Sequence, residues 1–220
     1  MKRGLVPILV VVVVLVIGGG VVCLRCSSPE VATQSGGALD TSPDVSEPNG
    51  SGAPVERPAK WAQPVKLPGC PNLHKVSDDL YRGAQPTAEG MRQLRELGIK
   101  TIVDLRSLHS DRDEMGDLQF NYEQIAMKAW HAEDEDVVRF LKIVSDRSNA
   151  PFFVHCEHGA DRTGTVCAVY RIAVQGWSKE EALKEMRDGG YGFHGVWRNL
   201  VRYINNLDIA EMKRRAGLQY

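Results

Sequence analysis

The stretch FFVHCEHGADRTG, residues 152–164, decides the fold. It begins with an apolar run that follows Pro151, too brief for a helix and typical of a central β-strand. A largely apolar helix is predicted over residues 163–174, and a helix of that composition is expected to be buried. A strand, a short polar loop and a buried helix in succession indicate a fold in which helices cover a sheet.

The sequence on both sides continues this alternation. Further strands are predicted to end at Gly83 and to span residues 99–105 and 122–127, where β-branched and apolar residues gather. Helices are predicted over residues 87–97, with Thr87 as N-cap, over 134–144, after a capping box that starts at Ser178, and over 196–207. The predicted fold class is α/β, with helices flanking a mostly parallel central sheet.

The polar loop carries Cys156 and Arg162 with five residues between them. Backbone N–H groups of such a loop, with those of the first helical turn, can converge on an anion. The planar guanidinium of Arg162 can hold two oxygens of a phosphate, and the same positive field favours the nucleophilic thiolate of Cys156. The residues expected to line a bound phosphate are Glu157, His158, Gly159, Ala160, Asp161 and Arg162.

His155-Cys156-x5-Arg162-Thr163-Gly164 resembles the signature of the cysteine-dependent protein tyrosine phosphatases, most like the compact dual-specificity group. The stretches YRGAQP at 81–86, DLR at 104–106 and GWS at 176–178 are similar to bacterial and fungal members of that group. The resemblance covers about residues 80–207. It implies a phosphatase-like fold and a phosphomonoester phosphatase that needs no cofactor and no metal ion.

The resemblance also implies roles for individual residues. Cys156 would attack phosphorus and form a cysteinyl-phosphate, while Arg162 and the loop amides hold the equatorial oxygens. Thr163 would donate a hydrogen bond to the sulfur and help it leave, and His155 would orient the loop through backbone hydrogen bonds.

The general acid is left open between two carboxyl groups. Many family members carry an aspartate some 30 residues before the cysteine, but residue 124 here is Gln. Asp134 could come from a nearby loop, although it is also suited to a helix N-cap. Asp161, directly before Arg162, is favoured because some relatives place an aspartate there, and its other interpretation is a salt bridge or loop-shaping hydrogen bond. His131 is a weaker choice.

The net charge of the chain and the charges of the loop limit which molecules the protein is expected to bind. With 27 Lys+Arg against 28 Asp+Glu, the net charge of −1 gives no general attraction to nucleic acid. The loop has no lysine and carries two acids, which favours a substrate with few charges: a phosphorylated protein or a small phosphomonoester. The alternatives are an inositol-phosphate or phosphoinositide phosphatase, a catalytically silent module that binds phosphorylated ligands, and a sulfur- or arsenic-handling enzyme with a rhodanese-like loop.

The two ends of the chain differ in composition from the region between them. Residues 5–24 carry no charge over 20 positions, a length that spans about 30 Å as a helix, so residues 1–26 are predicted to be a transmembrane anchor. A cleaved signal peptide and a lipid-modified Cys23 are the alternatives. A Pro/Ser/Gly-rich tether is predicted over 27–68, the phosphatase domain over 69–210 and a tail over 211–220. The expected location is a single-pass membrane protein with its catalytic domain outside the cytoplasm.

Overall fold

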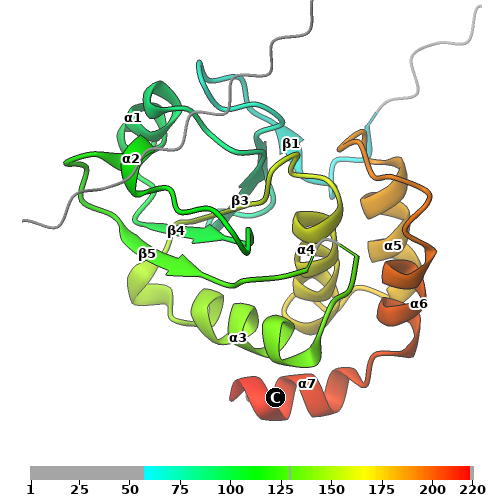
Figure 1. Cartoon of the computed structure of the whole chain (residues 1–220). Coiled ribbons are helices and arrows are strands. Elements are labelled where there is room, and N and C mark those ends of the chain that lie inside the picture. Colours follow the sequence, from blue (N-terminus) through cyan, green and yellow to red (C-terminus); the bar gives the residue numbers. More distant parts are fainter. Residues whose placement is uncertain (1–56, 129, 219–220) are drawn as a thin grey trace, which may run out of the picture. The chain divides into compact units, whose positions relative to one another are not determined.

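The computed structural model describes residues 57–218, apart from residue 129. Short strands and helices alternate over residues 80–173, after two short strands and before three further helices (Figure 1). In chain order they are β1 (Gln63–Pro64), β2 (His74–Lys75), β3 (Leu80–Gly83), α1 (Ala88–Glu96), β4 (Thr101–Asp104), α2 (Arg112–Met115), β5 (Asn121–Gln124), α3 (Asp134–Ser145), the 3₁₀ turn η1 (Arg147–Asn149), β6 (Phe152–His155), α4 (Asp161–Ala173), α5 (Lys179–Asp188), α6 (Arg198–Asn206) and α7 (Ile209–Ala216).

The strands form one mixed sheet in the order β1-β2-β3-β6-β4-β5. β3, β6, β4 and β5 run parallel, whereas β1 and β2 pair antiparallel with their neighbours. β6 lies in the middle, with Phe152 opposite Leu80 of β3 and Thr101 of β4. The loop that follows β6 therefore leaves the sheet at the carboxyl ends of its parallel strands, where ligands bind in α/β folds.

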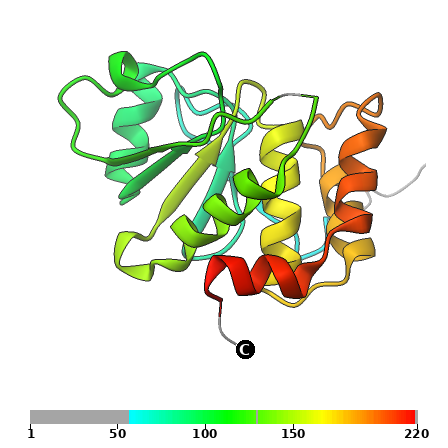
Figure 2. The ribbon, with the colours of Figure 1, turned by 60° about the horizontal axis from the view of Figure 1, so that its bottom comes forward.

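Both faces of β6 are buried, and successive side chains point to opposite faces. Phe153 packs with Met91 and Leu94 of α1 on one face. Phe152 and Val154 pack on the other face, in a cluster to which α3 and α4 contribute. α5, α6 and α7 add a further layer around α4 (Figure 2). This arrangement explains why eleven consecutive residues of α4, 163–173, are buried.

The predicted fold includes a membrane-spanning helix, and this part of the prediction is wrong. Among residues 57–218 without residue 129, every helix is too short or too polar to cross a membrane. The anchor predicted over residues 1–26 lies outside the described residues. The sheet is also mixed, because the antiparallel β1 and β2 extend the parallel strands. The fold is therefore described as an α/β fold with a mixed sheet flanked by helices.

Local signals fix several helix ends. The Thr87 side chain accepts a hydrogen bond from the backbone N–H of Gly90, and the capping box between Ser178 and Glu181 is complete, so both predicted caps are confirmed. The helix predicted over 196–207 ends at Asn206. Asp208 then caps α7, whose Met212 and Ala216 are buried.

Residues 57–68, which the sequence places in the tether, contact this fold. The guanidinium of Arg57 donates to the carbonyls of Ala62 and Gly189 and to the hydroxyl of Tyr191, each at 2.7 Å. The backbone N–H of Ala62 donates to Glu185 of α5. The predicted domain boundaries as such stay predictions.

Candidate active site

Cys156 follows β6 directly and is only 3% exposed. β3 lies on one side of β6 and β4 on the other, and the backbone N–H of Leu105 donates to the carbonyl of His155 at 2.9 Å. The cysteine thus lies at the end of the most central strand. Residues 156–160, here called the phosphate loop, then turn the chain into α4.

Three successive carbonyls of the phosphate loop face outward, because each accepts a hydrogen bond from its surroundings. In a trans peptide the carbonyl and the following N–H point in opposite directions. The N–H groups of residues 158–160 therefore face the inner side of the loop, where they can converge on an anion. The outward bonds are Gln85 N to Glu157 O at 3.1 Å, Asn72 Nδ2 to His158 O at 3.0 Å and Arg82 Nη2 to Gly159 O at 2.7 Å.

Gly159 has a structural reason to be glycine. Its φ is +67°, and a Cβ there would lie 2.4 Å from the carbonyl carbon and oxygen of Gly83 and 2.6 Å from the nitrogen of Ala84. The phosphate loop and the end of β3 can approach this closely only without a side chain.

The first turn of α4 brings two further groups to the loop. Arg162 is half-buried, and its Nη1 donates to the carbonyl of Leu105 at 3.3 Å. This bond takes one of the five guanidinium donors, so that the others can serve a ligand. Thr163 is fully buried, and its hydroxyl has no hydrogen-bond partner among the described residues. The predicted bond to sulfur stays a prediction.

Arg82 lies beneath the phosphate loop and is 2% exposed. Besides its bond to Gly159, its guanidinium lies 3.7 Å from the ring centroid of Tyr191. A buried cation at this position adds to the positive potential that an anion in the loop would feel.

His155 is held by a carboxylate from outside the loop. Its Nε2 lies 2.7 Å from Oδ2 of Asp111, and both side chains are fully buried. Burial by itself would raise the pKa of Asp111, but the hydrogen bond and charge of His155, with a bond from Gln85, hold this pKa below its ordinary value. His155 Nδ1 faces the carbonyl of Cys156 at 3.4 Å, which agrees with an orienting role.

Asp104, Asp111 and His155 stand close enough together to bind a metal ion, as do His109, Asp111 and Glu114. The side chains of the first three residues already have hydrogen-bond partners within the protein. Asp104 accepts a hydrogen bond from the hydroxyl of Tyr122 at 2.9 Å, and Asp111 pairs with His155. Burial raises the pKa of Asp104 above its ordinary value and that of Tyr122 to about 12. This pattern fits a hydrogen-bond network, and the expected absence of metal and cofactor stays a prediction.

Asp161 is the first residue of α4, and both of its carboxylate oxygens are engaged by one residue. The backbone N–H of His194 donates to Oδ1 at 2.9 Å, and His194 Nδ1 lies 2.7 Å from Oδ2. The side chain of Asp161 is 14% exposed and that of His194 is 52% exposed.

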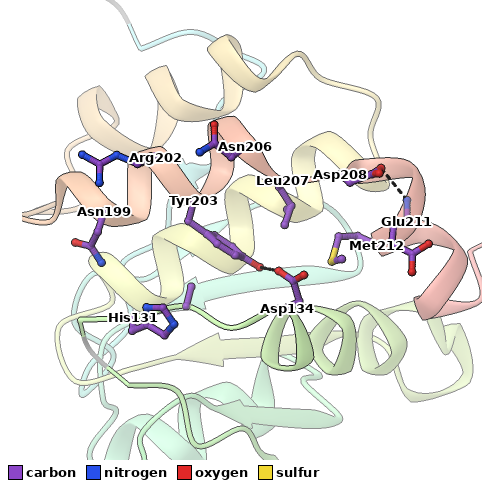
Figure 3. A pocket seen from close by; sticks show the side chains of 11 residues that line it. His131, Asp134, Asn199, Arg202, Tyr203, Asn206, Leu207, Asp208, Glu211 and Met212 are labelled. Atoms are coloured by element: carbon purple, nitrogen blue, oxygen red, sulfur yellow. Dashed lines mark hydrogen bonds between the residues drawn. The ribbon is translucent and has the colours of Figure 1, made fainter.

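Asp134 lies elsewhere. It begins α3 and accepts a hydrogen bond from the hydroxyl of Tyr203 at 3.0 Å, while Arg215 approaches it to 3.7 Å. It borders a pocket of about 440 Å³ between the start of α3 and the helices α6 and α7 (Figure 3), and none of the residues that line this pocket belongs to the phosphate loop. The N-cap of α3 is Glu133 rather than Asp134.

Several residues that shape the loop are not predicted from the sequence. Asn72, Asp111 and His194 carry no motif that points to the site, because their contacts with it are long-range. The sequence does not predict the contact of Arg82 with the phosphate loop either. Its position in YRGAQP, beside the glycine that the loop touches, was the available signal.

Comparison with known proteins gives a consistent picture. A family model described as a DSP-PTPase phosphatase fused to NAD+ kinase matches residues 63–197. The dual specificity protein phosphatase TpbA of Pseudomonas aeruginosa is 35% identical over 154 residues, which are 70% of this chain and 69% of that protein. The crystal structure of a cysteine-to-serine variant of TpbA in complex with phosphotyrosine matches with a TM-score of 0.67 and 32% identity, over 74% of this chain and all of that one. The inositol diphosphatase DSP5 of Arabidopsis thaliana is 27% identical over 66% of this chain and 73% of its own length.

Proposed function

The chain belongs to the dual-specificity group of cysteine-dependent phosphatases, and from this premise we propose that it hydrolyses phosphotyrosine in proteins, with Cys156 as the nucleophile. One observation carries the assignment. Cys156 begins a loop whose outward carbonyls turn consecutive N–H groups inward, with Arg162 on the helical turn that follows. Such a site suits the tetrahedral oxyanion of a phosphate.

The proposed reaction has two steps. The Cys156 thiolate attacks phosphorus, an S–P bond forms and the P–O bond to the leaving group breaks. Water then cleaves the S–P bond and releases inorganic phosphate and the free thiolate. Arg162 and the inward N–H groups stabilise the charge on the equatorial oxygens in both steps. Thr163, whose hydroxyl has no partner within residues 57–128 and 130–218, donates its hydroxyl hydrogen to the departing sulfur.

The leaving oxygen must take up a proton in the first step. Of the two carboxyl groups that the sequence offers, Asp161 borders the phosphate loop, whereas Asp134 is occupied by Tyr203 and lies at a separate pocket. We therefore propose that the proton donor is Asp161 or a residue in contact with it.

The charge of the loop supports the substrate class. Glu157 in the loop and Asp161 directly after it add negative charge, and residues 156–162 include no lysine to meet additional phosphates. A phosphotyrosine side chain brings one phosphate and an uncharged ring, so it is repelled less than a densely phosphorylated inositol. The inositol diphosphatase among the relatives supplies the second candidate, an inositol pyrophosphate.

The test compares substrates on the full-length protein. Hydrolysis of a phosphotyrosine peptide and of an inositol pyrophosphate is measured as phosphate release for wild type and for Cys156→Ser. Cys70→Ser is the matched control, because Cys70 is also buried and its desolvation raises the pKa of its thiol to about 11, which leaves it unreactive.

We expect the wild type and Cys70→Ser to prefer the peptide in kcat/KM and Cys156→Ser to lose all turnover. Binding of the peptide without hydrolysis by the wild type would instead identify a phosphate-binding module. A preference for the inositol pyrophosphate would overturn the substrate class while keeping the chemistry.

A further inference from the structure

His194 lies on the segment between α5 and α6, which is linked to the phosphate loop through Asn72 and Arg82. Asn72 Nδ2 donates both to the carbonyl of His158 in the loop and to the carbonyl of Tyr191, at 3.0 and 2.9 Å. The Tyr191 ring stacks on Arg82, which itself holds Gly159. The segment between α5 and α6 accordingly lies at the same end of α4 as the loop (Figure 2).

The His194 ring itself contacts both parts of the loop region. It pairs with Asp161, directly before Arg162, and meets the ring of His158 edge-on, with the centroids 6.0 Å apart. His158 is the second residue after the cysteine and Asp161 is the fifth. The ring therefore contacts a residue near Cys156 and the residue directly before Arg162.

The pairing with Asp161 determines what His194 can do chemically. Since both carboxylate oxygens accept from His194, the carboxylate serves as acceptor to that residue and has no further role as a free acid. Nδ1 of the ring is occupied, so Nε2 is the nitrogen left to face a ligand. A carboxylate bonded to one ring nitrogen orients the ring and determines which nitrogen is left for proton transfer.

We propose that His194, held by Asp161, is the general acid of the reaction. The proposal rests on the proposed phosphatase function. When the Cys156 sulfur forms its bond to phosphorus and the P–O bond breaks, the electron pair stays on the leaving oxygen. That oxygen takes the proton of His194 Nε2, which leaves a neutral imidazole. In the second step the same nitrogen takes a proton from the attacking water. Asp161 is a positioning residue, and His194 is the catalytic one.

Leaving-group dependence separates proton donation from mere support of the loop. A general acid matters most for a leaving oxygen that is a strong base, and little for one that departs readily as an anion. The experiment measures kcat/KM of the full-length protein for p-nitrophenyl phosphate and for phenyl phosphate, whose phenol resembles tyrosine with a pKa of about 10. The variant is His194→Asn, and His131→Asn, on the loop before α3, is its matched control.

For His194→Asn we expect a loss of about 10²-fold on phenyl phosphate and a loss several-fold smaller on p-nitrophenyl phosphate, because general acid catalysis contributes roughly 10²–10⁴-fold. Asp161→Asn should shift the same ratio in the same direction, and His131→Asn should leave the ratio at the wild-type value. Equal losses of His194→Asn on both substrates would overturn the proposal, as would a changed ratio in His131→Asn alone. If the wild type hydrolyses neither substrate, the proposed function itself fails.

Discussion

The side chain of His155 is oriented by a carboxylate that lies 44 residues earlier in the chain. Both groups are fully buried, so their hydrogen bond forms in a medium of low dielectric constant, where it is stronger than in water. His155 ends β6 and precedes Cys156, and the bond to Asp111 therefore fixes the residue from which the phosphate loop starts. Sequence alone could not reveal this pair, because Asp111 belongs to no recognisable motif.

Replacement of Asp111 by Asn should destabilise the protein. Asn keeps the size of the side chain but removes the negative charge, and a hydrogen bond to a charged group contributes about 1.5–3 kcal/mol. We expect the free energy of unfolding in urea to fall by that amount at pH 7. Asp113→Asn, at an exposed aspartate on the short helix α2 that follows Asp111, is the control and should change this free energy by less than about 0.5 kcal/mol.

The pH dependence of this effect follows from the pKa of Asp111. The pKa is lower in the folded than in the unfolded protein, so its stabilisation is fully present above the ordinary carboxyl pKa of about 4. It is lost as the pH falls through the lowered folded value. The difference between wild type and Asp111→Asn should thus be smaller at pH 3 than at pH 7. An equal difference at both pH values would contradict the assigned charge interaction.

The phosphate loop is positioned by three donors that come from outside β6 and α4. Asn72 precedes β2, Arg82 lies on β3 and Gln85 follows β3, and each takes one outward carbonyl. The loop is therefore shaped by its contact with the end of β3 as much as by its own sequence. The closest approach is at Gly159, against the backbone of Gly83.

Gly159→Ala should displace the loop and lower kcat. A Cβ at this position combines a positive φ with contacts of 2.4 Å to backbone atoms that cannot move aside cheaply. The inward N–H groups would shift from the phosphate, and removal of one oxyanion donor costs about 10²–10³-fold in kcat.

The control for this variant is Gly176→Ala, because Gly176 has a similar φ of +72° but open space around its Cβ. It should lose some stability through backbone strain and keep its kcat. If Gly159→Ala and Gly176→Ala had the same kcat as the wild type, the close approach of β3 would not matter for catalysis.

A helix or strand can be predicted from the sequence when the interactions that determine its ends lie between residues close together in the chain. The strand over 152–155, the helix after the loop and the caps at Thr87 and Ser178 rest on neighbouring residues, and they are found where the sequence predicts them. The start of α4 at Asp161 instead of Thr163 is a local detail of the same kind. The partner of Asp161 could not be predicted, because His194 is 33 residues away and belongs to a loop without regular structure.

At the scale of the whole molecule, a buried ion pair between α4 and α5 also binds the segment that precedes β3. Arg171 of α4 and Glu185 of α5 form two hydrogen bonds of 2.7 Å, Arg171 also donates to the carbonyl of Val76, and Glu185 accepts from the backbone of Ala62. Burial would raise the pKa of Glu185, but Arg171 and the other donors hold this pKa below its ordinary value.

Arg171→Met should therefore be strongly destabilising. The substitution leaves the buried charge of Glu185 without its cation, and breaking one side of a buried pair costs about 3–5 kcal/mol. Urea denaturation at pH 7 measures the change, with the exposed Arg187→Met on α5 as control. The double variant Arg171→Met/Glu185→Leu should recover part of the loss. A single variant as stable as its control would show that the pair does not contribute.

The sequence predicted the α/β class of the central layer but not the edge of the sheet. β1 and β2 have two residues each, too few to produce a periodic pattern, and β1 lies in a Pro-containing segment of low apolar content. Arg57 fastens that segment through contacts with residues more than 130 positions away. α7 overlaps the tail that the sequence predicts over residues 211–220, because the charged residues of this helix outnumber the two that it buries.

The decisive measurement traps the phosphorylated enzyme. Full-length protein is mixed with a phosphotyrosine peptide, quenched in acid within one turnover, digested and analysed by mass spectrometry. We expect a phosphate on the peptide that contains Cys156, and none on the corresponding peptide from Cys156→Ser. Turnover with phosphate on any other residue, or with none bound to the protein, would contradict the assignment of Cys156 as the nucleophile.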